Sequence, residues 1–372
     1  MNRALSERGA RDELAARGGL IGRAFTIIEL LIVIVILAIV TLIALPSFTS
    51  MLYSQEANLA ESLIRTGMKA SRDAALRSAS DDDAAAVFVF QAGGRISIVP
   101  CVRVGVLPPI SAADEPYEIF VPSSELEPVQ LPRNWMIRGY ASPSLAGDAP
   151  SAGGWYESDA GADRVVAGEG NWVFPETDFY DQRSASSGEE RQTFMVRFRA
   201  RTGEIVTSPS NPALVVLPRP TYLDRGSLPG NACNADRLDI AADLAQSVRC
   251  ILSSPEFDAA QRAELIGVGS SDAVMVRPVS QLALYDENKL AAGLGSEVDR
   301  VSRCLYRNVD GTTVTGPRLV NGVTAENINE WINGDTNLNG QVESSDQGDA
   351  PLAKLFMLDR YTGVPRLMEV QP

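Results

Sequence analysis

The longest apolar stretch of the chain lies near its N-terminus and carries a single charge. Residues 25–45 read FTIIELLIVIVILAIVTLIAL, and Glu29 is the charged position. At about 1.5 Å of rise per residue, a helix over this stretch is roughly 31 Å long, which matches the hydrocarbon core of a bilayer. A secretory signal peptide is the alternative, but its apolar region is usually about 7–15 residues and ends in a small-residue cleavage site. The pattern therefore favours one membrane-spanning helix.

Helical periodicity continues beyond this stretch. Pro46 removes one backbone donor, so we expect it to kink or loosen the helix without ending the pattern. Polar residues then occupy most faces, and apolar or small residues recur at helical spacing, namely Leu52, Leu59, Leu63, Gly67, Ala70 and Ala74. This stripe predicts an amphipathic continuation of the helix over residues 46–80, packed on a globular head, rather than a solvated stalk.

From residue 81 onward the pattern changes to short strands and turns. The expected strands are 86–90, 95–102, 193–199, 204–207, 214–217, 274–276, 281–285, 355–358 and 365–370, several of them paired through Gly-containing turns. An amphipathic helix is expected over 236–252, and large insertions at about 141–190 and 220–350. These elements predict an α+β protein in which a long N-terminal helix packs on an antiparallel β-sheet head with loop and helix insertions.

Charge gives an orientation to the membrane helix. Residues 1–24 hold five arginines and three carboxylates, and Arg17 and Arg23 lie close to the apolar stretch. The positive-inside rule then places the N-terminus in the cytoplasm and the head (residues 81–372) outside it. We expect a single-pass protein of the cytoplasmic membrane.

Glu29 is costly inside such a helix, because a charged side chain at the bilayer centre costs about 2.5–3.5 kcal/mol on insertion scales. Two readings are open. The carboxylate lies near the cytoplasmic end and could reach the interface, or it meets a positive charge within an assembly.

The N-terminal motif resembles that of type IV prepilins and pseudopilins. The resemblance is carried by residues 23–31, Arg-Ala-Phe-Thr-Ile-Ile-Glu-Leu-Leu, and by Pro46-Ser47-Phe48 after the apolar run. It implies that a prepilin peptidase cuts between Ala24 and Phe25, removes residues 1–24 as a leader and methylates the new amine. It also implies that Glu29 pairs with the N-terminal amine of a neighbouring subunit. Ala24 stands where the family usually has Gly, and the leader is longer than most.

A weaker resemblance concerns the head. Residues 46–105, and the turn near Gly203, are similar to the GspH/FimT branch of minor pilins and pseudopilins. The resemblance implies a minor pilin or pseudopilin of a type IV pilus or type II secretion system. It implies as partners other pilin or pseudopilin subunits, the prepilin peptidase, an inner-membrane assembly platform and the lipid bilayer. After assembly the protein would reside in a pilus or pseudopilus.

Four cysteines lie in the part expected outside the cytoplasm, where disulfides persist. Cys233 and Cys250 bracket the expected helix 236–252 and form the local pair, which leaves Cys101 with Cys304. Free buried thiols are the alternative. Because no CxxC spacing occurs, a four-cysteine zinc site is disfavoured.

A calcium loop is the strongest site signal in the head. Residues 335–346 read DTNLNGQVESSD, with Gly340 at the sixth position of the twelve-residue pattern. The candidate ligands are Asp335, Asn337, Asn339, Gln341 (through its carbonyl), Glu343 and Asp346. A structural Ca²⁺ is expected, and an Asp/Asn/Gly-rich surface turn is the alternative.

Composition narrows the classes of function. The chain has 372 residues, no histidine and a net charge of −14. Without histidine, Ser-His-Asp and Cys-His catalytic arrangements cannot form, and with no nucleophile elbow or phosphate loop we expect a non-enzymatic subunit. The acidic charge disfavours nucleic acid. The rival function is a pilus-tip adhesin or DNA-uptake subunit. The acidic charge argues against DNA binding unless arginines such as Arg197, Arg199 and Arg201 cluster on one face.

Overall fold

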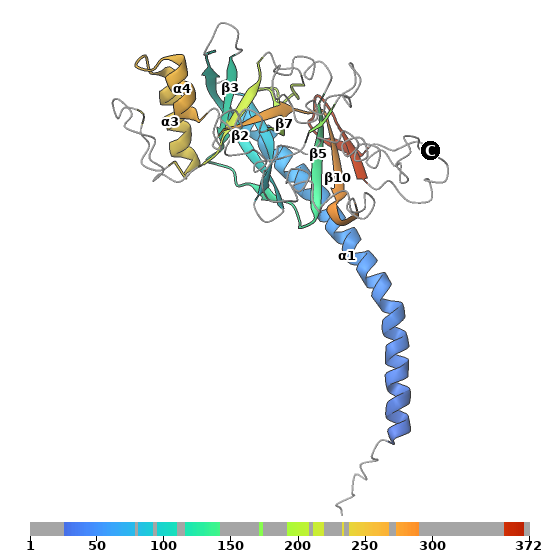
Figure 1. Cartoon of the computed structure of the whole chain (residues 1–372). Coiled ribbons are helices and arrows are strands. Elements are labelled where there is room, and N and C mark those ends of the chain that lie inside the picture. The colour runs from blue at the N-terminus through green and yellow to red at the C-terminus, as the bar shows by residue number, and fades with distance from the viewer. Residues whose placement is uncertain are drawn as a thin grey trace, which may run out of the picture. The chain divides into compact units, whose positions relative to one another are not determined.

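The chain folds into two compact units, Met1–Gln55 and Glu56–Pro372. The computed structural model describes residues 26–78, 81–91, 95–109, 116–141, 171–173, 192–207, 211–218, 233, 238–267, 273–289 and 353–367. Helix α1 (Ile27–Arg77) passes through Pro46 and contributes to both units (Figure 1). The sequence therefore predicted correctly that the helical pattern continues beyond this proline.

A closed ring of strands forms the centre of the second unit. Its strands are β1 (Ala84–Gln91), β2 (Arg95–Leu107), β3 (Tyr117–Pro122), β7 (Gln192–Phe198), β8 (Ala213–Val216) and β9 (Ala273–Pro278). The order β1-β7-β9-β8-β3-β2 closes because β1 also pairs with β2, and the short strand β4 (Val129–Gln130) adds to β2. The expected hairpin over 86–102 is confirmed by the antiparallel β1–β2 pair.

The expectation of a simple antiparallel sheet is wrong for this part of the head. The ring is a six-stranded barrel, and two of its pairs, β3–β8 and β7–β9, are parallel. Closure depends on the long strand β2, which pairs with β1 along its first half and with β3 along its second half. The register of β2 against β3 shifts between Arg103 and Gly105, and such bulges bend strands at barrel rims.

A second sheet is antiparallel throughout. Its order is β12 (Pro365–Leu367), β11 (Ala353–Leu358), β10 (Gln281–Asp286), β5 (Trp135–Ala141) and β6 (Asn171–Val173). The sheet packs closely on the barrel at Gly139, where a β-carbon would lie 2.6 Å from Val279 and 2.7 Å from Phe194. The rings of Phe194 and Phe88 in turn stack with centroids 4.6 Å apart.

The barrel interior is filled by alternate residues of its strands, as the two-residue period of a strand requires. The cluster comprises Ala85, Val87, Val89, Cys101, Phe120, Met195, Ala213, Val215 and Val276, all buried. The barrel interior, as far as the structure describes it, is therefore a packed apolar core.

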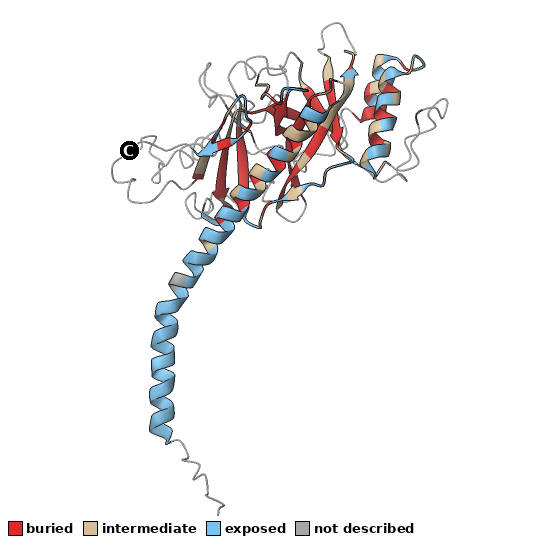
Figure 2. Ribbon diagram, turned by 180° about the vertical axis from the view of Figure 1, so that it is seen from behind, coloured by how far each residue is buried: buried red, intermediate tan, exposed pale blue. Residues whose placement is uncertain are grey.

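The part of α1 in the second unit packs one face on the outer surface of the barrel and on the second sheet (Figure 2). The buried positions recur every three or four residues, namely Ala57, Ala60, Ile64, Met68, Ser71 and Ala75. Gly67 lies against Ile98, and a β-carbon there would stand 2.7 Å from its Cγ2 atom. The sequence predicted that one face of this segment packs on the head, and the solvated-stalk alternative is wrong for these residues. The buried face is nevertheless offset from the predicted stripe: Gly67 is buried, Leu63, Ala70 and Ala74 are half-buried, and Leu52 and Leu59 are exposed.

Two short helices follow β8 in the chain. Helix α3 (Ala241–Ser253) occupies most of the range expected to be helical, and α4 (Ala259–Ile266) was not expected. The predicted insertion at 220–350 also contains strands β9 and β10, which are integral to the two sheets. The 141–190 range lies outside the described residues except for Ala141, at the end of β5, and strand β6.

Candidate functional site

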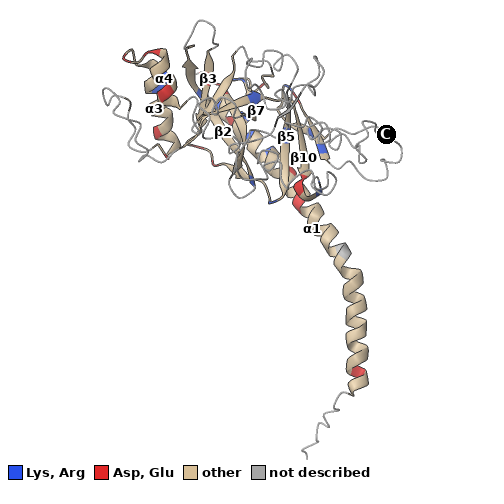
Figure 3. Ribbon diagram, in the orientation of Figure 1, with Lys and Arg blue, Asp and Glu red and all other residues tan. Residues whose placement is uncertain are grey.

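The N-terminal part of α1 presents apolar side chains on all sides. Every residue from Thr26 to Leu45 is exposed, and the exposed fractions of the large apolar side chains run from 47% for Val35 to 87% for Ile27. Figure 3 shows this part of the helix almost without charge. Exposed apolar surface of this extent is strongly unfavourable in water. The helix is long and apolar enough to cross a membrane, so lipid or other apolar helices can cover it.

Thr26 and Glu29 start the helix as a reciprocal pair. The backbone N–H and the hydroxyl of Thr26 both donate to Oε2 of Glu29 at 2.9 Å, and the N–H of Glu29 donates to the Thr26 hydroxyl at 3.3 Å. This is a capping box, which satisfies donors that the first turn leaves open. The Thr-x-x-Glu spacing of residues 26–29 is the signature that predicts it.

One carboxylate oxygen of Glu29 remains open. Its Oε1 atom accepts no hydrogen bond from a described residue, although Oε2 accepts two. The capping box therefore holds the carboxylate at the start of the helix and leaves one oxygen for a further cation. Neither of the two earlier readings of Glu29 included this local role.

The remaining residues of the expected processing and assembly site are only partly described. Ala24, Phe25 and the leader 1–24 lie outside the described residues. Pro46 lies within α1, and its side chain is not described.

The expected calcium loop lies wholly outside the described residues. This covers all six candidate ligands, Asp335, Asn337, Asn339, Gln341, Glu343 and Asp346. Within the described part of the chain, no three Cys, Asp or Glu side chains come together in a way that could hold a metal ion.

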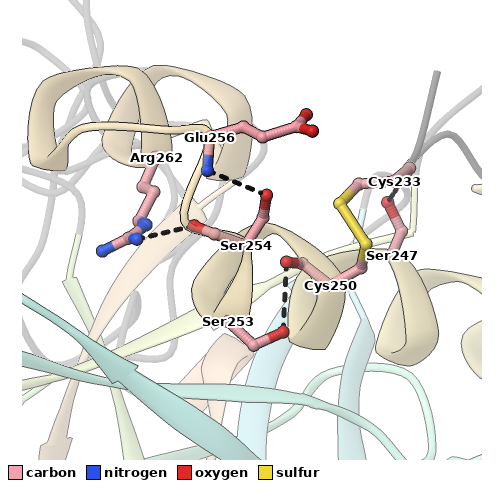
Figure 4. Close-up of a disulfide and its surroundings, with 7 residues drawn as sticks. All are labelled: Cys233, Ser247, Cys250, Ser253, Ser254, Glu256 and Arg262. Carbon is pink, nitrogen blue, oxygen red and sulfur yellow. Dashed lines mark hydrogen bonds between the residues drawn. A yellow bond between two sulfur atoms is a disulfide. The ribbon is translucent and has the colours of Figure 1, made fainter. Parts of the chain in front are cut away.

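The local disulfide is formed. Cys233 and Cys250 are bonded, with Cα atoms 5.3 Å apart, and tie α3 to the segment before it (Figure 4). The hydroxyl of Ser247, one turn earlier in α3, donates to the carbonyl of Cys233 at 2.7 Å. The helix is thus fixed to this segment by a covalent bond and a hydrogen bond.

The second expected disulfide, Cys101–Cys304, is wrong. Cys101 carries a free thiol and is fully buried in the barrel core on β2. Burial raises the pKa of this thiol far above its ordinary value, because the charged thiolate would lose its solvation. Cys304 lies outside the described residues.

A buried ion cluster closes one end of the barrel interior. Arg197 of β7 donates from Nε to Asp83 at 2.8 Å and from Nη2 to Glu118 at 3.1 Å, and its Nη1 also contacts Glu118. Arg103 donates to the same Glu118 at 3.0 Å. Burial alone would lower the pKa of Arg197, but Glu118 and Asp83 outweigh it and raise this pKa.

The alternation of inward-facing and outward-facing residues along β7 is the sequence signal that places Arg197 in this cluster. Arg197 follows Met195 at the two-residue period of inward-facing positions, so its side chain enters the barrel. Asp83 also accepts from the N–H of Ala200 at 2.9 Å, which closes the end of the strand. The cluster therefore has a structural role in the barrel.

The three arginines named as a condition for DNA binding are not equivalent. Arg197 is buried, whereas Arg199 and Arg201 are exposed and pair with Glu204 and Asp81. The structure therefore does not place the three together on one open face. This arrangement removes the observation on which a DNA-uptake role depended.

Comparison of the chain with protein-family models, with curated proteins and with solved structures found no match.

Proposed function

We propose that this chain is a structural subunit of the type IV pilin class, a minor pilin or pseudopilin of a type IV pilus or type II secretion system. One observation supports it most. A single carboxylate, Glu29, stands at the start of an exposed apolar helix and keeps one oxygen open. A neutral Gln can fill the same capping role in a membrane anchor, whereas the charge of Glu29 opposes insertion.

In the proposed mechanism, the helix first holds the protein in the cytoplasmic membrane, with its head outside. Removal of residues 1–24 by prepilin peptidase creates an amine at Phe25. In the assembled state, the apolar helix leaves lipid and packs among like helices, where the amine of one subunit approaches Oε1 of Glu29 in its neighbour. This ion pair offsets the cost of burying both charges and fixes the register between subunits.

Within the head, the C-terminal part of α1 is held on the barrel by the close approach of Gly67 to Ile98. The calcium loop over 335–346 remains a prediction within this proposal, with Ca²⁺ bracing a long loop outside the cytoplasm.

The test is incorporation of Glu29→Gln into the filament or pseudopilus fraction of the native host. Gln preserves the shape and the capping acceptor but removes the charge. We expect membrane levels of E29Q to equal or exceed those of the wild type, and its incorporation to be lost. Normal incorporation of E29Q would contradict the proposal. Glu56→Gln, at an exposed position further along α1, is the matched control and should incorporate normally.

A further inference from the structure

The turn between β11 and β12 projects two large side chains from the second unit. Tyr361 is 68% exposed, and Arg360 beside it is also exposed. The carboxylate of Asp359 accepts from the N–H groups of Tyr361 at 3.1 Å and of Thr362 at 2.9 Å. These bonds lower the pKa of Asp359, the contact with Thr362 most of all, and Gly363 supplies the positive φ of +65° that completes the turn.

Neighbouring elements hold this turn in place. Arg72 of α1 donates to the carbonyls of Gly203 at 3.2 Å and Tyr361 at 3.5 Å. The N–H of Ile205 donates to the carbonyl of Arg360 at 2.8 Å. Within the described residues, no carboxylate pairs with the Arg360 side chain. The turn is therefore pre-organised, and its guanidinium is open to an acidic partner.

The second unit also contains a hollow of about 480 Å³, at the C-terminal end of α1. Ala70 and Ala74 of α1 and Ala245 of α3 line it, and their small side chains leave the space between the two helices open. Cavities of roughly 300–1,000 Å³ hold drug-sized ligands, so this one has room for the side chains of a turn.

The charges at this hollow favour a cation. Asp73, Asp82 and Glu125 supply three carboxylates against the two guanidinium groups of Arg77 and Arg249. The C-terminal end of α1 adds the negative pole of its helix dipole. Three hydroxyl-bearing side chains, Ser78, Ser123 and Ser124, supply hydrogen-bonding groups beside the carboxylates.

The turn and the hollow lie beside different faces of the same helix. Arg72 contacts the turn, whereas the next residue, Asp73, lines the hollow. Successive residues of an α-helix project about 100° apart. A contact between the turn of one copy and the hollow of another therefore joins two different surfaces and is heterologous. Such contacts repeat from copy to copy and build rings or filaments.

We propose that the Arg360–Tyr361 turn of one copy docks into the hollow of a second copy of this chain. The guanidinium of Arg360 pairs with the carboxylates of the hollow, and the Tyr361 ring packs on its alanine-lined wall. Arg and Tyr are the residue types that most often dominate interface energetics. The partner is argued from local charge complementarity: the carboxylates that line the hollow match the exposed guanidinium of Arg360, and every copy of this chain carries both surfaces.

This inference rests on the proposed function as a filament subunit. It adds which surfaces of the heads meet when two copies assemble. The test uses two full-length, differently tagged copies expressed together in the native host. One carries Tyr361→Cys and the other Glu125→Cys, so a disulfide between the tags reports the contact. A pair of Tyr361→Cys with Glu256→Cys, an exposed position between α3 and α4, measures random collision and any contribution of native cysteines.

We expect the 361–125 pair to form a disulfide well above the yield of the 361–256 pair. Adding Arg360→Glu should lower the yield about tenfold, the effect of losing one strong interfacial side chain. Arg133→Glu, at an exposed turn before β5, should leave the yield unchanged. Asp73→Arg in the second copy should restore cross-linking to the Arg360→Glu chain, because the two charges are then exchanged.

Equal yields for the two cysteine pairs, or a yield insensitive to Arg360→Glu, would overturn the docking proposal. The N-terminus of the same samples separates this failure from failure of the proposed function. A chain that begins at Phe25 without a specific cross-link contradicts only the docking, and an unprocessed chain with a specific cross-link contradicts only the pilin role.

Discussion

Thr26 donates both its backbone N–H and its hydroxyl to one oxygen of Glu29, and the other oxygen of that carboxylate stays open. The same residue thus caps its own helix and remains able to bind a cation. This dual role separates two effects that substitution of Glu29 alone would confuse. One is local, on the start of the helix, and the other concerns assembly.

Substitution of Thr26 tests the local effect. Thr26→Val removes the hydroxyl that closes the capping box, and loss of such a cap costs about 0.5–2 kcal/mol of helix stability. We expect faster hydrogen exchange of the amides in the first turn of α1 in detergent micelles. Incorporation into filaments should persist, since the charge of Glu29 remains. If T26V lost assembly to the same extent as E29Q, capping and not charge would explain the role of Glu29.

Arg197 should be a major contributor to the stability of the head. Arg197→Met leaves Asp83 and Glu118 buried without their shared cation, and breaking a buried pair in this way costs about 3–5 kcal/mol. This loss is measured by unfolding the full chain in detergent with guanidinium chloride, with the fluorescence of the buried Trp135 as the probe. Arg199→Met is the control, because the exposed Arg199–Glu204 pair should be worth about 0–1 kcal/mol. Equal effects of the two substitutions would contradict the buried-cluster account.

Glu61 should make the packing of α1 on the second sheet sensitive to acid. Burial raises the pKa of this carboxyl, but its contacts with Arg65 at 2.9 Å and Lys354 at 3.4 Å outweigh burial and place the pKa below its ordinary 4.5. A depressed folded-state pKa means that the stabilisation is present above the unfolded-state pKa and is lost as pH falls through the folded value.

We therefore expect stability to decrease as pH falls below about 4.5, and Glu61→Gln to reduce this dependence. Thermal unfolding at a series of pH values provides the comparison, with Glu56→Gln as an exposed control on the same helix. The expectation fails if E61Q and the parent chain lose stability in parallel across this range.

The Cys233–Cys250 disulfide should stabilise the α3 segment. It closes a loop with a sequence separation of 17, and loops of this size are stabilised by about 3 kcal/mol through restriction of the unfolded chain. The double substitution Cys233→Ser, Cys250→Ser should lower the free energy of unfolding by about 2–4 kcal/mol.

The free thiol of Cys101 should stay unreactive toward maleimide until the barrel unfolds. Rapid labelling of Cys101 in the folded protein would contradict its place in the core.

Local sequence patterns were sufficient to predict those elements whose apolar residues repeat at a single spacing along the chain. The apolar run before Leu45, the existence of a packing face on α1, and the hairpin around 91–94 each have a local signal. The exact position of that face does not, because most residues of the predicted stripe lie beside the buried positions. The Cys233–Cys250 pair also followed from proximity in sequence. These features depend on contacts within a few turns or strands of the chain.

Closure of the barrel depends on distant pairings that no local period encodes. Strand β8 joins β3 in a parallel pair across more than ninety intervening residues, and β7 joins β9 in the same way across the helices α3 and α4. Strand β5 was missed because Arg138 is buried within it and interrupts the apolar pattern; its Nε donates to the hydroxyl of Tyr285 at 2.8 Å.

The direct test of the pilin proposal is the N-terminus and intact mass of the protein extracted from membranes of its native host. We predict a chain that begins at Phe25 and carries one added methyl group on its amine. A chain that begins at Met1 would contradict the proposal, because Glu29 would then have no processed amine to bind and the helix would serve as a static anchor.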